Sequence, residues 1–142
     1  MMTVVIDAEN VIMGRLATFV AKKLLEGENV VVVNAEKAVI TGRPDAIFDR
    51  YKMKRNLGGP MKPFKGPFHP RMPDRIVRRS IRGMLPMKKS SGRDAYQRCM
   101  TYIGVPREFA KSEKMVLDAK TNLPRSRYVY VAEVSKFLGA KF

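Results

Sequence analysis

Four consecutive valines at residues 30–33 constrain the fold of this chain more than any other short segment. A strand with one face in water alternates apolar and polar residues, whereas a strand of a parallel sheet is covered on both faces and can be apolar throughout. Valine is β-branched and favours strands. The four valines therefore predict a buried strand in a parallel sheet that has other elements packed on both faces.

The segments around these valines predict a βαβ unit. A short apolar run at residues 3–7 predicts the first strand, and residues 38–41 form a second β-rich stretch after the valines. Between the first strand and the valines, apolar residues recur at helical spacing, and Gly27 is placed to end the helix. These apolar residues are Met13, Leu16, Ala17, Val20 and Leu24. The pattern is typical of an α/β domain.

The rest of the chain alternates helices, loops and short strands. Pro44 and Asp45 predict the first turn of a helix that runs through residue 51. Five of the nine prolines lie within residues 57–73, which predicts an extended loop. Helices are expected at residues 73–85, at residues 91–100 after a Ser91–Asp94 capping box, and at residues 132–138. Strands are expected at residues 100–105 and 128–131.

The positive charge is concentrated in one segment, residues 50–93, which we call the basic arm. The arm holds 14 of the 28 Lys and Arg residues and only one acidic residue, Asp74, so its net charge is +13. The remainder of the chain has 14 basic and 12 acidic residues, a net charge of +2. Such an excess repels itself unless a polyanion neutralises it. Nucleic acid is the expected partner, and an anionic membrane surface is the main competitor.

The helix expected at residues 73–85 carries the most specific pattern. Arg75, Arg78, Arg79 and Arg82 fall at i, i+3, i+4 and i+7, so they share one face. Val77, Ile81, Met84 and Leu85 fall on the opposite side. A face that is merely solvated would mix in acidic residues, and arginine suits bidentate phosphate contact, so the stripe favours phosphate binding.

The proline-rich loop intersperses cations with aromatic rings. Phe64 and Phe68 lie among Lys62, Lys65, His69 and Arg71, a pattern typical of backbone neutralisation with base stacking. The alternative that the two phenylalanines pack back onto the core is equally open from the sequence. His69 is expected to make a polar contact or to lie at the surface.

Several other classes of protein lack support in the sequence. Residues 7–14, after the first predicted strand, match no phosphate-binding glycine motif, and no acid/base pair is evident. Cys99 is the single cysteine and His69 the single histidine, which excludes a disulfide and a Cys/His zinc site, and Cys99 is expected in the core. No apolar run is long enough to span a membrane. We expect a cytoplasmic protein without cofactor, metal site, small-molecule substrate or membrane partner.

Several short motifs occur in order along the chain: Ile-Asp-Ala at 6–8, Gly-Arg-Leu-Ala at 14–17, Asn-Ala-Glu-Lys-Ala at 34–38 with Thr41-Gly42, and, as the most specific, Arg-Gly-Met-Leu-Pro at 82–86. Together they resemble the universal large-subunit ribosomal protein L13 family. Gly92, Tyr102 and Gly104 continue the pattern. The direct connection from Gly27 to the valines, the 57–73 loop and the terminal Val-Ser-Lys-Phe-Leu-Gly resemble the archaeal branch.

The resemblance implies a three-layer α/β/α domain around a four-stranded, mainly parallel sheet, with large-subunit ribosomal RNA and neighbouring ribosomal proteins as partners and no catalysis. We expect one domain, residues 1–142, whose arm binds RNA. By chemistry, and for Arg82 also by motif, the candidate RNA-binding residues are Lys52, Lys54, Arg55, Lys62, Lys65, His69, Arg71, Arg75, Arg78, Arg79, Arg82, Lys88, Lys89 and Arg93. The alternatives are a DNA-binding regulator that uses residues 73–85 and 91–100 as a helix-turn-helix, and an RNA-modifying enzyme.

Overall fold

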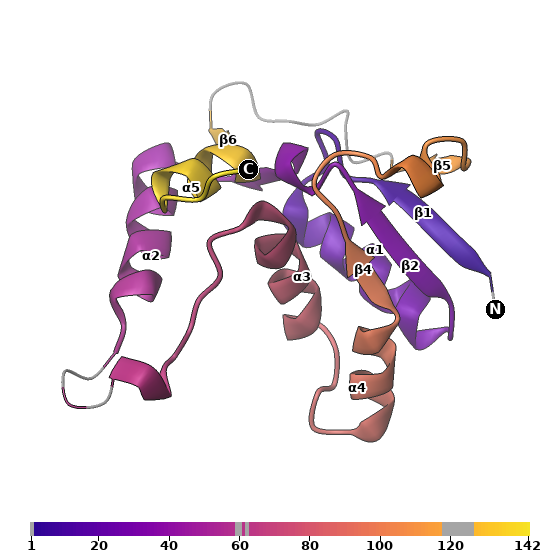
Figure 1. Cartoon of the computed structure of the whole chain (residues 1–142), viewed down its shortest axis with the longest axis horizontal. Coiled ribbons are helices and arrows are strands. Elements are labelled where there is room, and N and C mark those ends of the chain that lie inside the picture. Colours follow the sequence, from indigo (N-terminus) through magenta and orange to yellow (C-terminus); the bar gives the residue numbers. More distant parts are fainter. Residues whose placement is uncertain (1, 59–60, 62, 118–126) are drawn as a thin grey trace.

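The computed structural model describes residues 2–58, 61, 63–117 and 127–142. Its centre is a four-stranded sheet in the order β4-β2-β1-β5, in which every neighbouring pair is parallel (Figure 1). The strands are β1 (Thr3–Asp7), β2 (Asn29–Val33), β4 (Cys99–Thr101) and β5 (Lys114–Val116). This confirms the expected α/β class and the four-stranded parallel sheet.

Strand β2 lies inside the sheet and is covered on both faces, as its four valines predict. Val30 and Val32 belong to the main core, together with buried residues of α1 (Met13–Leu25), α3 (Pro73–Gly83) and α4 (Ser90–Gln97). Val31 and Val33 join Val5 in a second cluster on the other face. There Tyr102, Val105 and Phe109, the last in the short 3-10 helix η3 (Arg107–Phe109), pack against them. The arrangement is consistent with a three-layer α/β/α domain.

A second, smaller sheet lies beside the first. Strands β3 (Val39–Thr41) and β6 (Tyr128–Tyr130) pair in antiparallel fashion, and α5 (Val131–Phe137) follows β6 directly. A separate core of Ile47, Val129 and Val134 joins this sheet to α5 and to α2 (Pro44–Asn56). The helices expected at residues 44–51 and 132–138 are thereby confirmed.

The strand that completes the main sheet was missed by the sequence analysis. Strand β5 has only three residues, and the apolar run Met115-Val116-Leu117 is too short to indicate a strand by itself; the Met115 and Val116 side chains are exposed. It becomes a strand only because its backbone pairs with residues 5–7 of β1 at the edge of the sheet.

The capping box expected at Ser91 and Asp94 was wrong. Helix α4 begins one residue earlier, after Lys89, with no side-chain capping bond, and it ends at Gln97, so Met100 lies in β4. The start is fixed by backbone packing instead. Gly92 lies so close to the preceding turn that a Cβ atom there would clash with the Pro86 carbonyl oxygen.

This close approach predicts that Gly92→Ala destabilises the domain. The turn and α4 would have to move apart, at a cost of about 1 to 3 kcal/mol, and the melting temperature should fall. Gly14→Ala is the matched control, because a Cβ atom at Gly14, in the first turn of α1, meets nothing within 4 Å. The control should melt at or slightly above the wild-type temperature. Equal melting of the two variants would contradict the packing described here.

Candidate nucleic-acid interface

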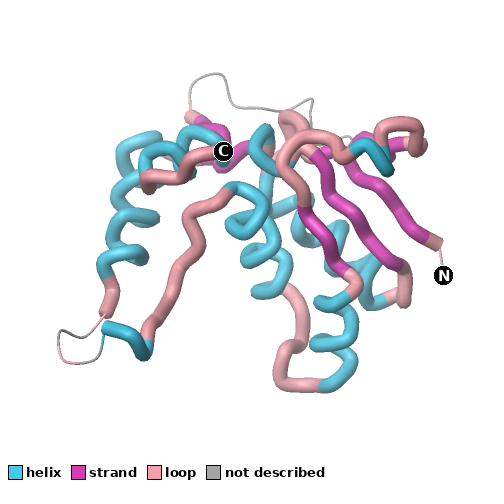
Figure 2. The backbone as a smooth tube through the Cα atoms, in the orientation of Figure 1, coloured by secondary structure: helices cyan, strands magenta, loops and turns pink. Residues whose placement is uncertain are grey.

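The basic arm runs from the second half of α2, along the loop and through α3 to the start of α4. Figure 2 shows the second part of the loop returning between α2 and α3. Most candidate RNA-binding side chains are exposed: Lys52, Lys54, Arg55, Lys65, Arg71, Arg75, Arg79, Lys88, Lys89 and Arg93. Three are half-buried, namely His69, Arg78 and Arg82, and Lys62 lies outside the described residues. The fold thus presents a broad cationic surface built from three helices and one loop.

No cation of the arm has a carboxylate partner among the residues that the structure describes. The ion pairs found there join Lys23 to Glu26 and Glu28, and Lys37 to Glu9, all outside the arm. Interactions between exposed charges of opposite sign contribute little to folding, whereas an unneutralised cluster of one sign opposes the compact state. The charge of the arm is therefore available to an external polyanion.

The arginine stripe of α3 differs in part from the pattern expected from its spacing. Arg75 and Arg79 are exposed as expected. The Arg78 guanidinium instead lies over the Tyr96 ring of α4, 4.6 Å from its centroid, and the Arg78 Nε atom is buried. A planar cation over an aromatic face is attractive, and α4 brings that ring within reach only through tertiary packing.

The apolar face of α3 also differs at two positions. Ile76 is buried and belongs to the main core, although the spacing had not singled it out. Met84 was expected to pack inward but is 44% exposed, because α3 ends at Gly83 and Met84 no longer follows the helical face. Val77, Ile81 and Leu85 are buried, as predicted.

The two loop phenylalanines point away from the core. Phe64 is 72% and Phe68 77% exposed, so the alternative in which they pack back onto the core is wrong. Phe68 lines an open groove together with Arg55, Arg71 and Arg75, and with His69, Pro70, Met72 and Asp74. An exposed ring among three guanidinium groups can stack on a base while the cations hold phosphates.

Two side chains anchor the end of the loop, and sequence reasoning had not found these anchors. The Arg55 Nη1 atom donates a hydrogen bond of 2.9 Å to the His69 carbonyl oxygen, which ties the loop to α2. The Ser135 hydroxyl donates a hydrogen bond of 2.7 Å to the Arg71 carbonyl oxygen, which ties it to α5. Both bonds go to the backbone, so no pattern of loop residue types could have indicated them.

Polar residues of the short motifs mostly organise the ends of the strands. Asp7 Oδ1 accepts hydrogen bonds of 3.0 Å from the Glu9 amide and from Asn34 Nδ2, which joins the loops after β1 and β2. Glu36 Oε2 accepts a hydrogen bond of 2.9 Å from the Gly104 amide, after β4. These carboxylates are engaged in holding the backbone and are separate from the basic arm.

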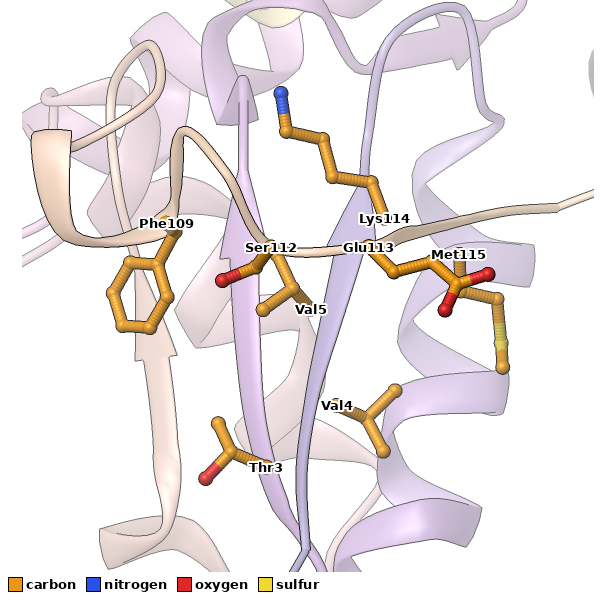
Figure 3. A pocket seen from close by; sticks show the side chains of 8 residues that line it. All are labelled: Thr3, Val4, Val5, Phe109, Ser112, Glu113, Lys114 and Met115. Carbon is orange, nitrogen blue, oxygen red and sulfur yellow. The ribbon is translucent and has the colours of Figure 1, made fainter.

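The hollow at the open edge of the sheet lacks the geometry of an active site. It lies between β1 and residues 109–115, and its lining residues include Ser112, Glu113 and Lys114. Figure 3 shows the Glu113 carboxylate and the Lys114 ammonium group pointing in different directions, away from each other. In the described part of the chain, no group of three His, Cys, Asp or Glu residues could hold a metal ion. No helix there is long and apolar enough to cross a membrane.

Comparisons with known proteins identify a family and several relatives of this chain. The family model described as ribosomal protein L13 matches residues 1–108. The chain is 51% identical over 142 residues to the large ribosomal subunit protein uL13 of Archaeoglobus fulgidus, covering 95% of this chain and 86% of that protein. It is 47% identical to uL13 of Methanococcoides burtonii, covering 97% and 99%, and 48% identical to uL13 of Methanocaldococcus jannaschii, covering 97% and 98%.

The different surroundings of two neighbouring arginines predict different effects on stability. Arg78→Gln removes the planar cation over Tyr96 and places an uncharged amide at the same half-buried position. It should therefore lower the free energy of unfolding by about 0.5 to 2 kcal/mol. Arg79→Gln, the matched control on the exposed side of α3, should change it by less than about 0.5 kcal/mol. Thermal melts of the two variants measure the difference, and identical melting temperatures would show that the contact with Tyr96 contributes nothing.

The surroundings of Cys99 predict that its thiol is unreactive in the folded protein. The side chain is buried in the main core, and burial raises the pKa of the Cys99 thiol to about 11, against a smaller lowering by Arg78. The reactive thiolate is therefore rare at pH 8. Iodoacetamide should alkylate the native protein slowly and the denatured protein rapidly, as followed by mass spectrometry. Rapid alkylation without denaturant would place Cys99 at an accessible site.

Proposed function

This chain belongs to the ribosomal protein L13 family, a structural and non-enzymatic component of the ribosome, and from that premise we propose that it binds and stabilises folded ribosomal RNA of the large subunit. In this role it supports assembly of the subunit and hence translation. Its cytoplasmic location within the large subunit, and contacts with neighbouring ribosomal proteins, belong to the same proposal. The protein acts by positioning RNA, without a chemical step, a cofactor or a small-molecule substrate.

One observation carries the proposal: the basic arm has a net charge of +13 and no carboxylate partner among the described residues. Cations that contact phosphates release condensed counterions, and this release supplies much of the affinity of a protein for nucleic acid. An RNA helix hides its base edges in a deep major groove, so recognition depends mainly on folded shape. A cationic surface that spans three helices and a loop suits such a shape.

We assign contacts with the RNA to all the candidate residues of the arm, including the half-buried His69, Arg78 and Arg82. The exposed cations contact phosphates, and Lys62 is included on the basis of the sequence alone. Arg55 and Arg78 contribute less, because each also holds structure, Arg55 through the His69 carbonyl and Arg78 through the Tyr96 ring. In this proposal residues 1–142 form one domain that includes the arm. The core that holds α3 in place therefore also holds the phosphate-binding arginines of α3 in place.

The DNA-binding alternative has less support. Residues 84–89 separate α3 from α4, whereas a helix-turn-helix joins its helices by about three or four residues. A preference for a B-form duplex over structured RNA in the binding experiment below would support this alternative and contradict the proposal.

The proposal predicts strongly salt-dependent binding to large-subunit ribosomal RNA. If about six phosphates are contacted, affinity should fall roughly a thousandfold between about 50 and 200 mM salt. In the variant Arg75→Gln, Arg79→Gln, Arg82→Gln, affinity should drop and the slope of log K against log salt should become shallower by about 2 to 3. Filter binding at several salt concentrations measures both quantities.

A control variant separates the arm from net charge alone. Arg107→Gln, Lys111→Gln, Lys141→Gln removes the same charge at three exposed residues outside the arm. It should leave the salt slope near that of the wild type. A flat salt profile for the wild type would refute RNA binding through phosphates, and equal slopes for the two variants would refute the assignment to α3.

A further inference from the structure

A cavity of about 240 Å³ lies where α2, the returning loop and α3 meet. We call it the α2–α3 cavity. Its lining residues are Tyr51 and Lys54 of α2, His69 and Pro70 of the loop, and Ile76, Arg79 and Ser80 of α3. Pockets for drug-sized ligands have volumes of roughly 300 to 1,000 Å³, so this one suits a smaller group, such as a single ring system.

The walls of the α2–α3 cavity combine apolar and cationic groups without an acidic one. Ile76 is buried in the core, and the Tyr51 ring is half-buried and packs against both the main core and the core beneath α5. Lys54 and Arg79 are exposed and carry the positive charge at the rim. Burial raises the pKa of the Tyr51 hydroxyl, against a smaller lowering by Arg50, so this wall remains neutral at physiological pH. The site therefore matches a ligand with a planar ring and an adjacent negative charge.

The position of Lys54 relative to Tyr51 supports this match. The Lys54 ammonium group lies 5.5 Å from the centroid of the Tyr51 ring, so a cation and an aromatic wall are neighbours. A nucleotide likewise carries a phosphate close to its base. Proteins that recognise RNA by sequence commonly bind such unstacked bases on aromatic side chains, with the backbone held by cations.

We propose that the α2–α3 cavity receives one unstacked nucleotide of ribosomal RNA, with its base beside Tyr51 and its phosphate on Lys54 and Arg79. This inference rests on the proposed function. It adds a base-binding site to the basic surface, whose other contacts are with phosphates. The loop wall is fixed in place by the hydrogen bonds from Arg55 to the His69 carbonyl and from Ser135 to the Arg71 carbonyl. A site whose walls are held in place loses less conformational freedom on binding.

Two variants test the cavity without changing its charge. Tyr51→Leu removes the ring. Ser80→Leu leaves Tyr51 in place and enlarges a half-buried lining residue of α3, whose hydroxyl donates to the Ile76 carbonyl oxygen and to the Met13 sulfur, so the larger side chain should narrow the cavity. Each should weaken binding to large-subunit ribosomal RNA about 5- to 150-fold, which is the range expected for the loss of one base stacked on an aromatic ring. The salt slope should become shallower by no more than about 1, because Lys54 and Arg79 remain and only the phosphate of the excluded nucleotide can be lost. Tyr51→Phe is the matched control, because it retains the ring and should bind RNA within a few-fold of the wild type.

Ultraviolet cross-linking of the full chain to the RNA gives an independent readout. A base stacked in the cavity should cross-link to the peptides that contain Tyr51 or His69, and this cross-link should be lost in Ser80→Leu. Thermal melts show whether each variant is folded. If Tyr51→Leu does not fold, Ser80→Leu and the cross-link decide the outcome.

The outcomes distinguish the inference from the function on which it rests. If the wild type fails to bind ribosomal RNA in a salt-dependent way, the proposed function itself fails. If the wild type binds as expected, but Tyr51→Leu and Ser80→Leu bind RNA as tightly as the wild type and the cross-links map elsewhere, the cavity site is refuted and the proposed function stands. Cross-links from the cavity peptides to a neighbouring protein in purified large subunits would assign the cavity to a protein contact and would also overturn the inference.

Discussion

Burial of strand β2 on both faces is the constraint on which the other elements depend. Its four valines cannot remain in water, so α1, α3 and α4 cover one face, and the segment with Tyr102, Val105 and Phe109 covers the other. Burying apolar surface is worth about 25 cal/mol per Å², and close packing makes the position of each covering element specific. Because α3 is one of the covering elements, its exposed side, with Arg75 and Arg79, is fixed relative to the sheet. Helix α3 thus contributes one of its faces to the core and the other to the basic surface.

Separation of charge makes this arrangement possible. Outside the arm the chain is nearly neutral, and Lys23 and Lys37 pair with glutamates there. Two further carboxylates, Asp7 and Glu36, accept hydrogen bonds from backbone amides at the ends of the parallel strands. The arm, in contrast, has almost no acidic residues to satisfy its cations. A domain built this way tolerates a strongly basic segment because repulsion acts at its surface, where water and salt screen it, and RNA can then replace that screening.

The cations of the arm serve two purposes, and tertiary contacts separate them. Arg55 holds the returning loop through the His69 carbonyl, and the Arg78 guanidinium lies over the Tyr96 ring. These two arginines therefore help to position the loop and helices on which the other cations of the arm are exposed. The loop held in this way forms one wall of the α2–α3 cavity, beside Lys54 and Arg79. A binding surface with both free cations and a preformed hollow can combine affinity for the RNA backbone with a preference for a particular folded segment.

The sequence by itself determined the α/β class, the two-sided burial of β2, the helices beginning at Met13, Pro44 and Pro73, and the charge of the arm. Each of these follows from local spacing and residue type, because periodicity reports which side of an element is apolar. Only the tertiary structure decided that β5 is an edge strand of the main sheet, that β3 pairs with β6, and that α4 starts at Ser90, with Gly92 packed against the Pro86 carbonyl. It also decided that Arg78 meets Tyr96 and that Tyr51 lines a cavity. The physical reason is that strand partners, close backbone approaches and cation–ring contacts join residues far apart in the chain, and local spacing carries no information about which of them meet.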